Sequence, residues 1–503
     1  MMIMIKRFIK IFMSGMFCTL LTSCLSFDVK ESTSDTLVLY PDYKDVTIPY
    51  NIAPLNFMPE GVDKGMVRFE NETGATLIVS VRNGRTSIPS KKWRDLLSET
   101  KGGGLSVTVM NDEGLAYQPF MIYVAEEPVD KYVAYRLIAP GYKLWGEMGI
   151  YQRDLESFRQ KVVIESKDVD NACLNCHSFA NRDPEKMMMH VRTTEYGGTY
   201  VSVDGDWEKL DTKTPQTISA LVYPSWHPSG RYIAYSVNDT KQTFHVSDPD
   251  RIEVYDFRSD VVVYDVEKRS LITNEALFRT DAFETFPSFS NDGTRLYFCS
   301  ADSLLMPTNY RNLKYSLCSI GFDASSGRFG QVDTLVKAGN ESVTMPRVSP
   351  DGRYLLYTTT EYGNFTIWHK DADLMLVNLE DRTVAEAEPW NSADAESFHS
   401  WSGNSRWVVF STRRDDGCHT RLYLGYIGGD GTLGKAFLIP QKDPMQNKRL
   451  MKSYNIPEFV EDEIPAKGFD VRNAGEAVKV SFAGGKGVTV TDATTGASVS
   501  SVN

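Results

Sequence analysis

The amino-acid sequence predicts a mainly β protein whose larger part is a β-propeller, a ring of similar antiparallel sheets. The main observation is a repeat in which an apolar strand, a turn of the Pro-Asp-Gly type and a second apolar strand follow one another. Four copies span residues 223–236, 286–298, 345–357 and 398–410. One such blade cannot bury both faces of its sheet, whereas blades packed in a ring can. The first third of the chain is also rich in β-branched and aromatic runs separated by Gly and Asn turns, which predicts further strands.

Length and charge limit the possible functions. The chain has 503 residues, which predicts two or three domains, and its hydrophobic content of 42% is enough for sizeable cores. Its formal net charge is -12. A nucleic-acid partner would require a basic stripe, so we expect no nucleic-acid binding.

The N-terminus has the pattern of a secretory signal at residues 1–23. Basic residues come first, and the apolar run 11–21 that follows is too short to span a membrane. The run ends in Leu-Thr-Ser-Cys, which resembles a bacterial lipobox and implies lipidation of Cys24. A simple cleaved signal peptide is the alternative. We therefore expect a lipid-anchored protein of the cell envelope, at the outer membrane, on a face that the sequence leaves open.

The segments that follow the signal are a tether and a β domain. Residues 24–40 are polar and predict a flexible tether. Residues 41–165 contain β runs such as 75–81, 105–109 and 120–124, with one short helical pattern near 91–100. This spacing predicts a small sandwich-like domain.

A cofactor motif stands between the β domain and the repeats. Cys173, Cys176 and His177 form C-x-x-C-H, the attachment signature of a c-type haem. Two thiols three residues apart lie on one side of a helical turn, where each can add to a haem vinyl group while His177 binds the iron. We therefore expect residues 166–195 to form a short helical segment that holds one covalent haem c. The alternatives are a dithiol, a disulfide or half of a zinc site, although no second Cys pair is available for zinc.

The sixth iron ligand has several candidates. Asp183 and Pro184 predict the start of a short helix. That helix would carry three Met and one His, and either Met187 or His190 is the expected distal ligand. The Met run could instead pack against the porphyrin. A five-coordinate iron or a more distant ligand is the remaining alternative, the distant candidates being His227, His245 and His369.

The propeller is expected over residues 196–465. Strand patterns such as 260–266, 374–379 and 422–427 lie between the four plain copies, and weaker copies at 198–205 and after residue 450 could bring the total to about six blades. Residues 466–503 form a weak β pattern, either an appended module or a frayed end.

The repeats resemble a known family. Their Ser-Pro-Asp-Gly texture, plainest at residues 349–352, is similar to the WD40-like repeats of TolB-type β-propellers, for which six blades are expected. The whole order resembles a family of Bacteroidetes-type lipoproteins in which a c-type cytochrome motif is fused to such a propeller. The resemblance therefore implies the order of the domains and motifs but no specific function.

Three functions compete at this point. The first is one-electron transfer by a lipid-anchored monohaem cytochrome, with the propeller docking a redox partner or another envelope protein. The second is a haem enzyme or sensor for a small ligand, similar to the haem–propeller fusion of hydrazine-synthase-like subunits. The third is a module that binds a protein or glycan and carries a structural haem. No Ser-His-Asp spacing or H-E-x-x-H helix is visible, so no catalytic residue is predicted.

Other reactive side chains are expected to be structural. The carboxylates Glu284, Asp394 and Glu396 are predicted to lie in blade turns and at the funnel rim. Cys299 and Cys318 are expected on neighbouring strands, either as one disulfide or as buried free thiols.

Overall fold

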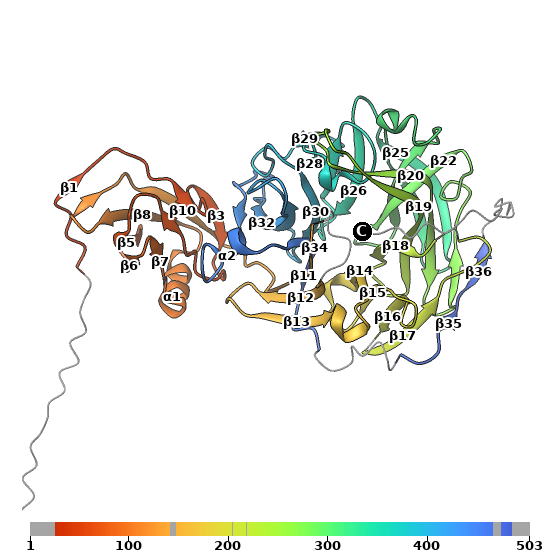
Figure 1. The fold of residues 1–503 in the computed structure, drawn as a ribbon, viewed down its shortest axis with the longest axis horizontal. Coiled ribbons are helices and arrows are strands. Elements are labelled where there is room, and N and C mark those ends of the chain that lie inside the picture. Colours follow the sequence, from red (N-terminus) through yellow and green to blue (C-terminus); the bar gives the residue numbers. More distant parts are fainter. Residues whose placement is uncertain (1–25, 141–146, 204, 218, 466–473, 485–503) are drawn as a thin grey trace, which may run out of the picture.

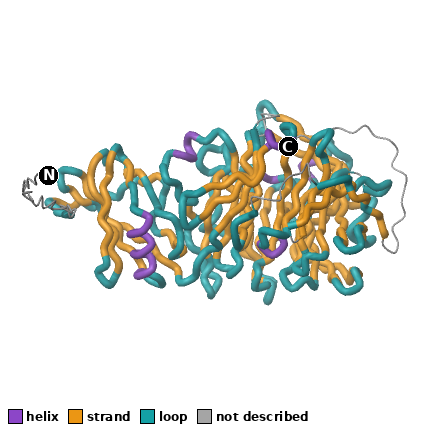
Figure 2. Tube along the Cα trace, turned by 90° about the horizontal axis from the view of Figure 1, so that it is seen from below, coloured by secondary structure: helices purple, strands orange, loops and turns teal. Residues whose placement is uncertain are grey.

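The computed structural model describes residues 26–140, 147–203, 205–217, 219–465 and 474–484. The predicted signal peptide, Cys24 and the last part of the tail therefore lie outside the described residues. The chain forms an N-terminal β domain and a six-bladed β-propeller that lies beside it (Figure 1). Strands dominate both parts, and helices are few and short (Figure 2). No helix in the described part is long and apolar enough to cross a membrane.

The N-terminal domain is built on one eight-stranded mixed sheet. Its strands are β1 (Glu31–Ser32), β3 (Val46–Pro49), β5 (Lys64–Asn71), β6 (Thr76–Arg82), β7 (Arg85–Thr86), β8 (Gly104–Asn111), β9 (Leu115–Ala116) and β10 (Phe120–Ala125). A separate two-stranded ribbon pairs β2 (Leu39–Tyr40) with β4 (Met58–Pro59). Buried and less buried residues alternate along β6, as expected of a sheet with one face on a core.

One helix covers this sheet. Helix α1 (Ser90–Thr100) buries Trp93, Leu96, Leu97 and Thr100, whose three- to four-residue spacing places them on one face. Trp93 packs edge-on against Phe69 of β5 at 5.4 Å between ring centroids. The described part of the N-terminal domain is thus one large sheet covered by a helix, with the β2–β4 ribbon beside it. The expected two-sheet sandwich is not observed there. The expected tether also contains structure, because β1 pairs with β9 and β2 pairs with β4.

Five blades are formed by four consecutive strands each. Blade 1 contains β14 (Cys173–Phe179), β15 (Met187–Arg192), β16 (Gly198–Val203) and β17 (Asp206–Asp211). Blade 2 contains β18 (Leu221–Trp226), β19 (Tyr232–Phe244), β20 (Ile252–Asp265) and β21 (Ser270–Ile272). Blade 3 contains β22 (Ala282–Phe289), β23 (Arg295–Asp302), β24 (Ser316–Asp323) and β25 (Arg328–Val336).

The remaining consecutive blades follow the same pattern. Blade 4 contains β26 (Ser342–Val348), β27 (Tyr354–Thr360), β28 (Asp373–Asn378) and β29 (Val384–Glu386). Blade 5 contains β30 (Glu396–Trp401), β31 (Trp407–Thr412), β32 (Arg421–Tyr426) and β33 (Phe437–Leu438), and the short helix α2 (Gln446–Arg449) follows it.

Blade 6 closes the ring with strands from distant parts of the chain. Its innermost strand is β34 (Ser453–Val460), which pairs with β11 (Tyr132–Ile138) and is followed outward by β12 (Gly149–Asp154) and β13 (Gln160–Glu165). Residues 132–165, which were expected in the N-terminal domain, therefore belong to the propeller. Two tail strands, β35 (Val478–Lys479) and β36 (Ser481–Gly484), add parallel edges to blades 1 and 2.

The segment predicted to be a haem-binding helix is instead two strands of blade 1. β14 carries Cys173, Cys176 and His177, and it pairs antiparallel with β15. The predicted helix at Met187 to His190 is β15, in which Met187 and Met189 join one core cluster and Met188 joins the next. The helix prediction was wrong because a blade lies between two neighbours. Both of its faces are buried, so an unbroken apolar run fits a strand of period two.

The N-terminal domain packs on the side of blades 5 and 6. One apolar cluster contains residues of both parts, among them Val46, Trp93, Trp407 and Phe459. Tyr43 contacts Phe437 edge-on at 6.4 Å between ring centroids.

Candidate functional site

The geometry of the propeller axis is set by a bulge in the innermost strand of each blade. One residue of every inner strand has a positive φ, and the antiparallel register shifts there. The six residues are Cys176 (47°), Tyr223 (50°), Phe286 (49°), Met345 (53°), Phe398 (29°) and Ile456 (48°). We call them the bulge ring. All six line the axial cavities described below.

The end of the cysteine motif is the blade 1 copy of this bulge. Four inner strands place Pro after the bulge residue, and blades 1 and 5 place His177 and His399 there. Proline is tolerated at a bulge, because the ladder lacks a hydrogen bond there. Cys-His-Ser-Phe in blade 1 thus corresponds to Phe-Pro-Ser-Phe in blade 3 and Phe-His-Ser-Trp in blade 5. Aligning these four-residue strings could have identified β14 as an inner strand from the sequence.

The comparison with blade 5 explains the position of His177. His399 Nε2 lies 3.0 Å from the carbonyl oxygen of Leu356, in the second strand of the preceding blade. Ala134 occupies the corresponding position in β11 of blade 6, the blade before blade 1 in the ring. Its backbone carbonyl favours the protonated form of the buried His177 ring. Burial nevertheless lowers the pKa of His177 to about 3, so the ring is neutral. Neither ring nitrogen has a hydrogen-bond partner of normal geometry among the described residues.

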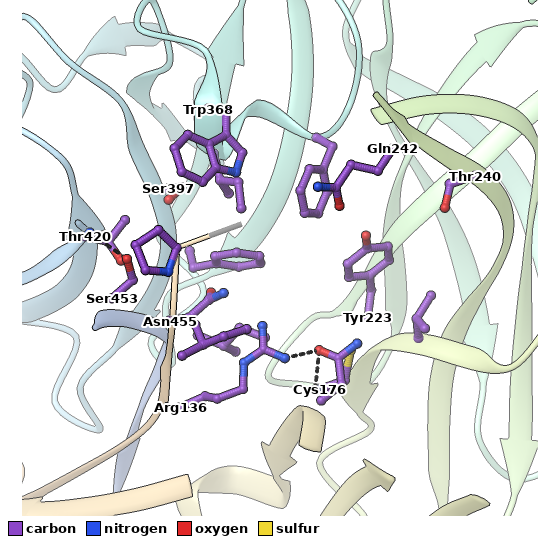
Figure 3. A pocket seen from close by; sticks show the side chains of 18 of the residues that line it. Arg136, Cys176, Tyr223, Thr240, Gln242, Trp368, Ser397, Thr420, Ser453 and Asn455 are labelled. Carbon is purple, nitrogen blue, oxygen red and sulfur yellow. Dashed lines mark hydrogen bonds between the residues drawn. The ribbon is translucent and has the colours of Figure 1, made fainter. Parts of the chain in front are cut away.

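An upper axial cavity of about 150 Å³ lies on one side of the bulge ring. Side chains from several blades point into it (Figure 3). Its charged lining residues are Arg136, Arg192 and Arg413, and among the described residues no Asp or Glu lines it. The neutral polar lining consists of Asn175, Ser219, Asn238, Thr240, Gln242, Ser397, Thr420, Ser453 and Asn455. Its aromatic lining consists of Tyr223, Phe365, Trp368 and Phe398.

Two of these arginines are deeply buried. Arg136 is 4% exposed, and its Nη1 donates to the carbonyl oxygen of Leu174 at 3.1 Å and to Asn175 Oδ1 at 2.5 Å. Arg413 is 3% exposed, donates from Nη1 to the carbonyl oxygen of Cys418 at 3.1 Å, and lies over the Trp368 ring. Burial lowers the pKa of Arg413 to about 9, which leaves it charged at neutral pH. The Nε atoms of both side chains have no partner in the described part of the chain.

A long hairpin forms one wall of this cavity. Strands β19 and β20 have 13 and 14 residues and continue beyond the other strands of blade 2 (Figure 1). Asn238, Thr240 and Gln242 of β19 line the cavity. The hairpin therefore presents amide and hydroxyl groups to the cavity.

Two carboxylates of the hairpin, Glu253 and Asp256, bind to blades 3 and 4 instead. Glu253 Oε2 lies 3.2 Å from His369 Nε2 and accepts a hydrogen bond from Tyr362 at 3.0 Å. Asp256 accepts hydrogen bonds from Tyr315 at 2.9 Å and from Asn364 at 2.8 Å. These buried contacts hold the hairpin in place.

A lower cavity of about 40 Å³ lies on the other side of the bulge ring. Cys176, His177, His399, Arg347 and Glu458 are among its lining residues. Burial raises the pKa of Glu458 to about 7 and lowers that of His399 to about 3. This cavity is smaller than the upper axial cavity.

The predicted haem ligands do not surround one space that fits a porphyrin. Cys173 packs in an apolar cluster and lines neither axial cavity, Cys176 lines both, and His177 lines only the lower one. Drug-sized ligands occupy pockets of about 300–1,000 Å³, and a four-ring porphyrin is larger than the 150 Å³ cavity accepts. The strand conformation of β14 also lacks the helical turn that would place both thiols on one side.

The candidate distal ligands are also remote from His177. Met187 is buried in a blade core, and His190 Nδ1 lies 3.2 Å from Thr199 Oγ1. Neither residue lines an axial cavity. The more distant candidates have other contacts: His227 bonds Ser229 and Gly293, His369 bonds Glu253, and His245 stacks on Tyr310.

Two further expectations concern the buried carboxylates and the remaining cysteines. Glu284 and Glu396 lie in inner strands and are fully buried, so they are not rim residues, and Glu396 pairs with Arg414 at 3.0 Å. Cys299 and Cys318 are buried free thiols on the neighbouring strands β23 and β24. They belong to different core clusters, because positions offset by one residue point to opposite faces of a sheet.

Comparisons with known proteins add a fold-level context. No model of a known protein family matches the chain, and no curated protein matches it. Among solved structures, TolB from Acinetobacter baumannii is 13% identical, with a TM-score of 0.42 over 74% of this chain and 85% of that chain. The periplasmic gluconolactonase of Pseudomonas aeruginosa is 15% identical, with a TM-score of 0.34 over 66% of this chain and all of that chain.

A third similar structure is prolyl oligopeptidase B from Galerina marginata. It is 12% identical, with a TM-score of 0.35 over 67% of this chain and 42% of that chain. All these TM-scores are below 0.5, so the functional argument rests on the side chains of this chain. Its strand pairing defines the class of protein as a six-bladed β-propeller with an appended N-terminal β domain.

Proposed function

We propose that the protein is a binding protein whose upper axial cavity holds a small ligand between the bulge ring and the β19–β20 hairpin. The observation that carries this proposal is the pair Arg136 and Arg413, whose Nε atoms have no partner in a cavity without a described carboxylate. Burying a charged group whose hydrogen bonds are incomplete costs on the order of several kcal/mol. A bound ligand that pairs with these groups would offset part of that cost.

A cavity-filling variant tests this proposal. Thr240 lines the cavity, whereas its neighbour Lys241 is exposed and does not, so Thr240→Trp should block binding and Lys241→Trp should not. Ligands are found by a thermal-shift screen of small metabolites. A ligand at 100 times its Kd stabilises the folded protein by about 2.7 kcal/mol.

We expect ligands that raise the Tm of the wild type and of Lys241→Trp but not of Thr240→Trp. If every stabilising compound acts equally on both variants, the upper axial cavity is not the binding site.

The C-x-x-C-H spacing favours a second candidate function, one-electron transfer to a redox partner through one covalent haem c. Cys173, Cys176 and His177 would hold the group, with Met187 or His190 as distal ligand. Bound haem supplies redox chemistry at its iron. Because the residues of β14 do not surround a porphyrin-sized space, this candidate requires β14 to leave blade 1.

Absorption spectra and mass spectra test whether the haem that the second candidate requires is attached. The full chain is expressed with and without a periplasmic haem maturation system. From the buried strand position of both cysteines, we expect no Soret band and an unmodified tryptic peptide around Cys173. A haem-sized mass increase on that peptide would show the covalent haem that the electron-transfer candidate requires, and it would reject our assignment of β14 to blade 1 in the mature protein.

The proposal also includes a cellular location. The signal-like residues 1–23 and Cys24 support export and lipid attachment in the cell envelope, where another envelope protein is the expected partner. Cys24→Ser should abolish incorporation of labelled palmitate and release the protein from the membrane fraction. Unchanged labelling would reject Cys24 as the attachment site.

A further inference from the structure

We infer that the ligand of the upper axial cavity is an acidic sugar, of the size of one uronic acid ring. This inference rests on the proposed function and names the ligand class. Three properties of the lining carry it: its charge, its neutral polar groups and its size.

The charge of the lining selects an anion. The chain has a net charge of -12, yet the described lining of this cavity contains arginines and no carboxylate. The hairpin carboxylates Glu253 and Asp256 are hydrogen-bonded to blades 3 and 4 instead. Asp394 and Asp416 act on the charge of Arg413 from outside this lining. A guanidinium binds a carboxylate through two parallel hydrogen bonds, and burial strengthens that contact.

The neutral polar groups select a ligand with many hydroxyls. Four amide side chains and six hydroxyl side chains, Tyr223 included, line the cavity. Both kinds of group donate and accept hydrogen bonds, as sugar hydroxyls do. The rings of Phe365 and Phe398 offer apolar faces on which the C–H face of a sugar can pack. Three of the polar groups have no hydrogen-bond partner among the described residues: Asn238 Oδ1, Ser397 Oγ and Asn455 Oδ1. A phosphate or sulfate ion would pair with the arginines but offers fewer hydroxyl groups than a sugar to donate to these two amide oxygens.

The size of the cavity limits the ligand to about one ring. Its volume of about 150 Å³ is below the range of about 300–1,000 Å³ that is usual for drug-sized ligands. A nucleotide or an oligosaccharide is therefore too large to be enclosed, whereas a monosaccharide acid, or the terminal residue of a longer chain, fits best.

Calorimetric titration of the full chain tests the ligand class. The probes are galacturonate and glucuronate, the matching neutral sugars galactose and glucose, and acetate and phosphate as anions without a sugar ring. We expect one of the two uronates to bind at least about 10-fold more tightly than its neutral counterpart and than either simple anion, because only it uses both the charge and the hydroxyl groups.

Two substitutions identify the arginine contact. Arg413→Gln and Asn455→Asp should each weaken uronate binding at least about 10-fold, the first by removing a cation and the second by adding a carboxylate at nearly constant shape. Arg353→Gln, on an exposed turn, should leave the affinity unchanged. Thermal melts confirm that each variant is folded, and Asn455→Asp keeps the test valid if Arg413→Gln fails to fold.

The outcomes separate the two proposals. If neutral sugars, acetate or phosphate bind as tightly as the uronates, or if folded Asn455→Asp binds them unchanged, the acidic-sugar inference is overturned. A different ligand that is lost in Thr240→Trp would then leave the proposed function standing. If no compound depends on Thr240, the proposed function fails as well.

Discussion

Replacing Glu284 by glutamine is expected to stabilise the folded protein by about 2–4 kcal/mol at pH 8.5 and to change its stability little at pH 4. Glu284 is 0% exposed in β22, and burial, reinforced by the charge of Asp260, raises its pKa to about 8. Its contacts are weak: the backbone N–H of Arg279 lies 3.4 Å away, and the Ser300 hydroxyl 3.5 Å away. The ionised carboxylate is thus poorly compensated.

The direction of the pH dependence follows from this raised pKa. Between about pH 4.3 and pH 8 the folded chain retains a proton on Glu284 that the unfolded chain releases. The free energy of unfolding therefore falls as the pH rises through this window, and the loss is complete above pH 8. Glutamine stays neutral throughout, so the variant lacks this part of the slope.

Urea denaturation at pH 4, 6 and 8.5 measures the effect. Glu275→Gln, an exposed Glu on the loop before β22, serves as the matched control and should follow the wild-type curve. Asp260, whose pKa burial raises to about 7, leaves a smaller residual slope in the Glu284→Gln protein. A Glu284→Gln curve parallel to the wild type over the whole range would contradict the prediction.

The second large effect is expected at the strand that closes the ring. Phe459→Ala should destabilise the protein by about 3–5 kcal/mol, the usual cost of truncating a buried aromatic ring. Phe459 is 1% exposed in β34, pairs with Val133 of β11 and belongs to the cluster that joins the propeller to the N-terminal domain. Its loss weakens ring closure and the domain interface together.

A second Phe→Ala change in the C-terminal part provides the control. Phe482 lies in β36, is only partly buried, and adds an edge to blade 2 without closing the ring. Phe482→Ala should cost about 1 kcal/mol. Thermal and urea unfolding of both variants measure the difference, and equal losses would show that β34 is not the critical closing strand.

Local sequence patterns were sufficient to predict four of the six blades. The four copies beginning at Tyr223, Phe286, Met345 and Phe398 coincide with the inner hairpins of blades 2 to 5. Each blade is a local unit of strands joined by short turns, so its signature lies within a short stretch of sequence.

Blades 1 and 6 were predicted only in part: the weak copies at 198–205 and after residue 450 coincide with β16 and β34, but the other strands of these blades were assigned elsewhere, for two different reasons. In blade 1 the bulge carries Cys176 and His177 in place of an apolar residue and Pro, and the cysteine spacing favoured a haem-binding helix. In blade 6 the inner strand lies more than 300 residues after its partner β11, so no contiguous repeat exists. The interpretation of a helix at Met187 to His190 failed because a run buried on both faces has no visible period.

The sequence by itself determined that the chain is mainly β, that repeated blades form its larger part, and that a C-x-x-C-H string precedes them. Only the tertiary structure decided that β14 belongs to the ring, that β34 closes it, and that Arg136 and Arg413 line one cavity. The physical reason is the range of the interactions. Strand and turn patterns depend on residues within one hairpin, whereas ring closure and the axial cavity depend on contacts between residues that are hundreds of positions apart.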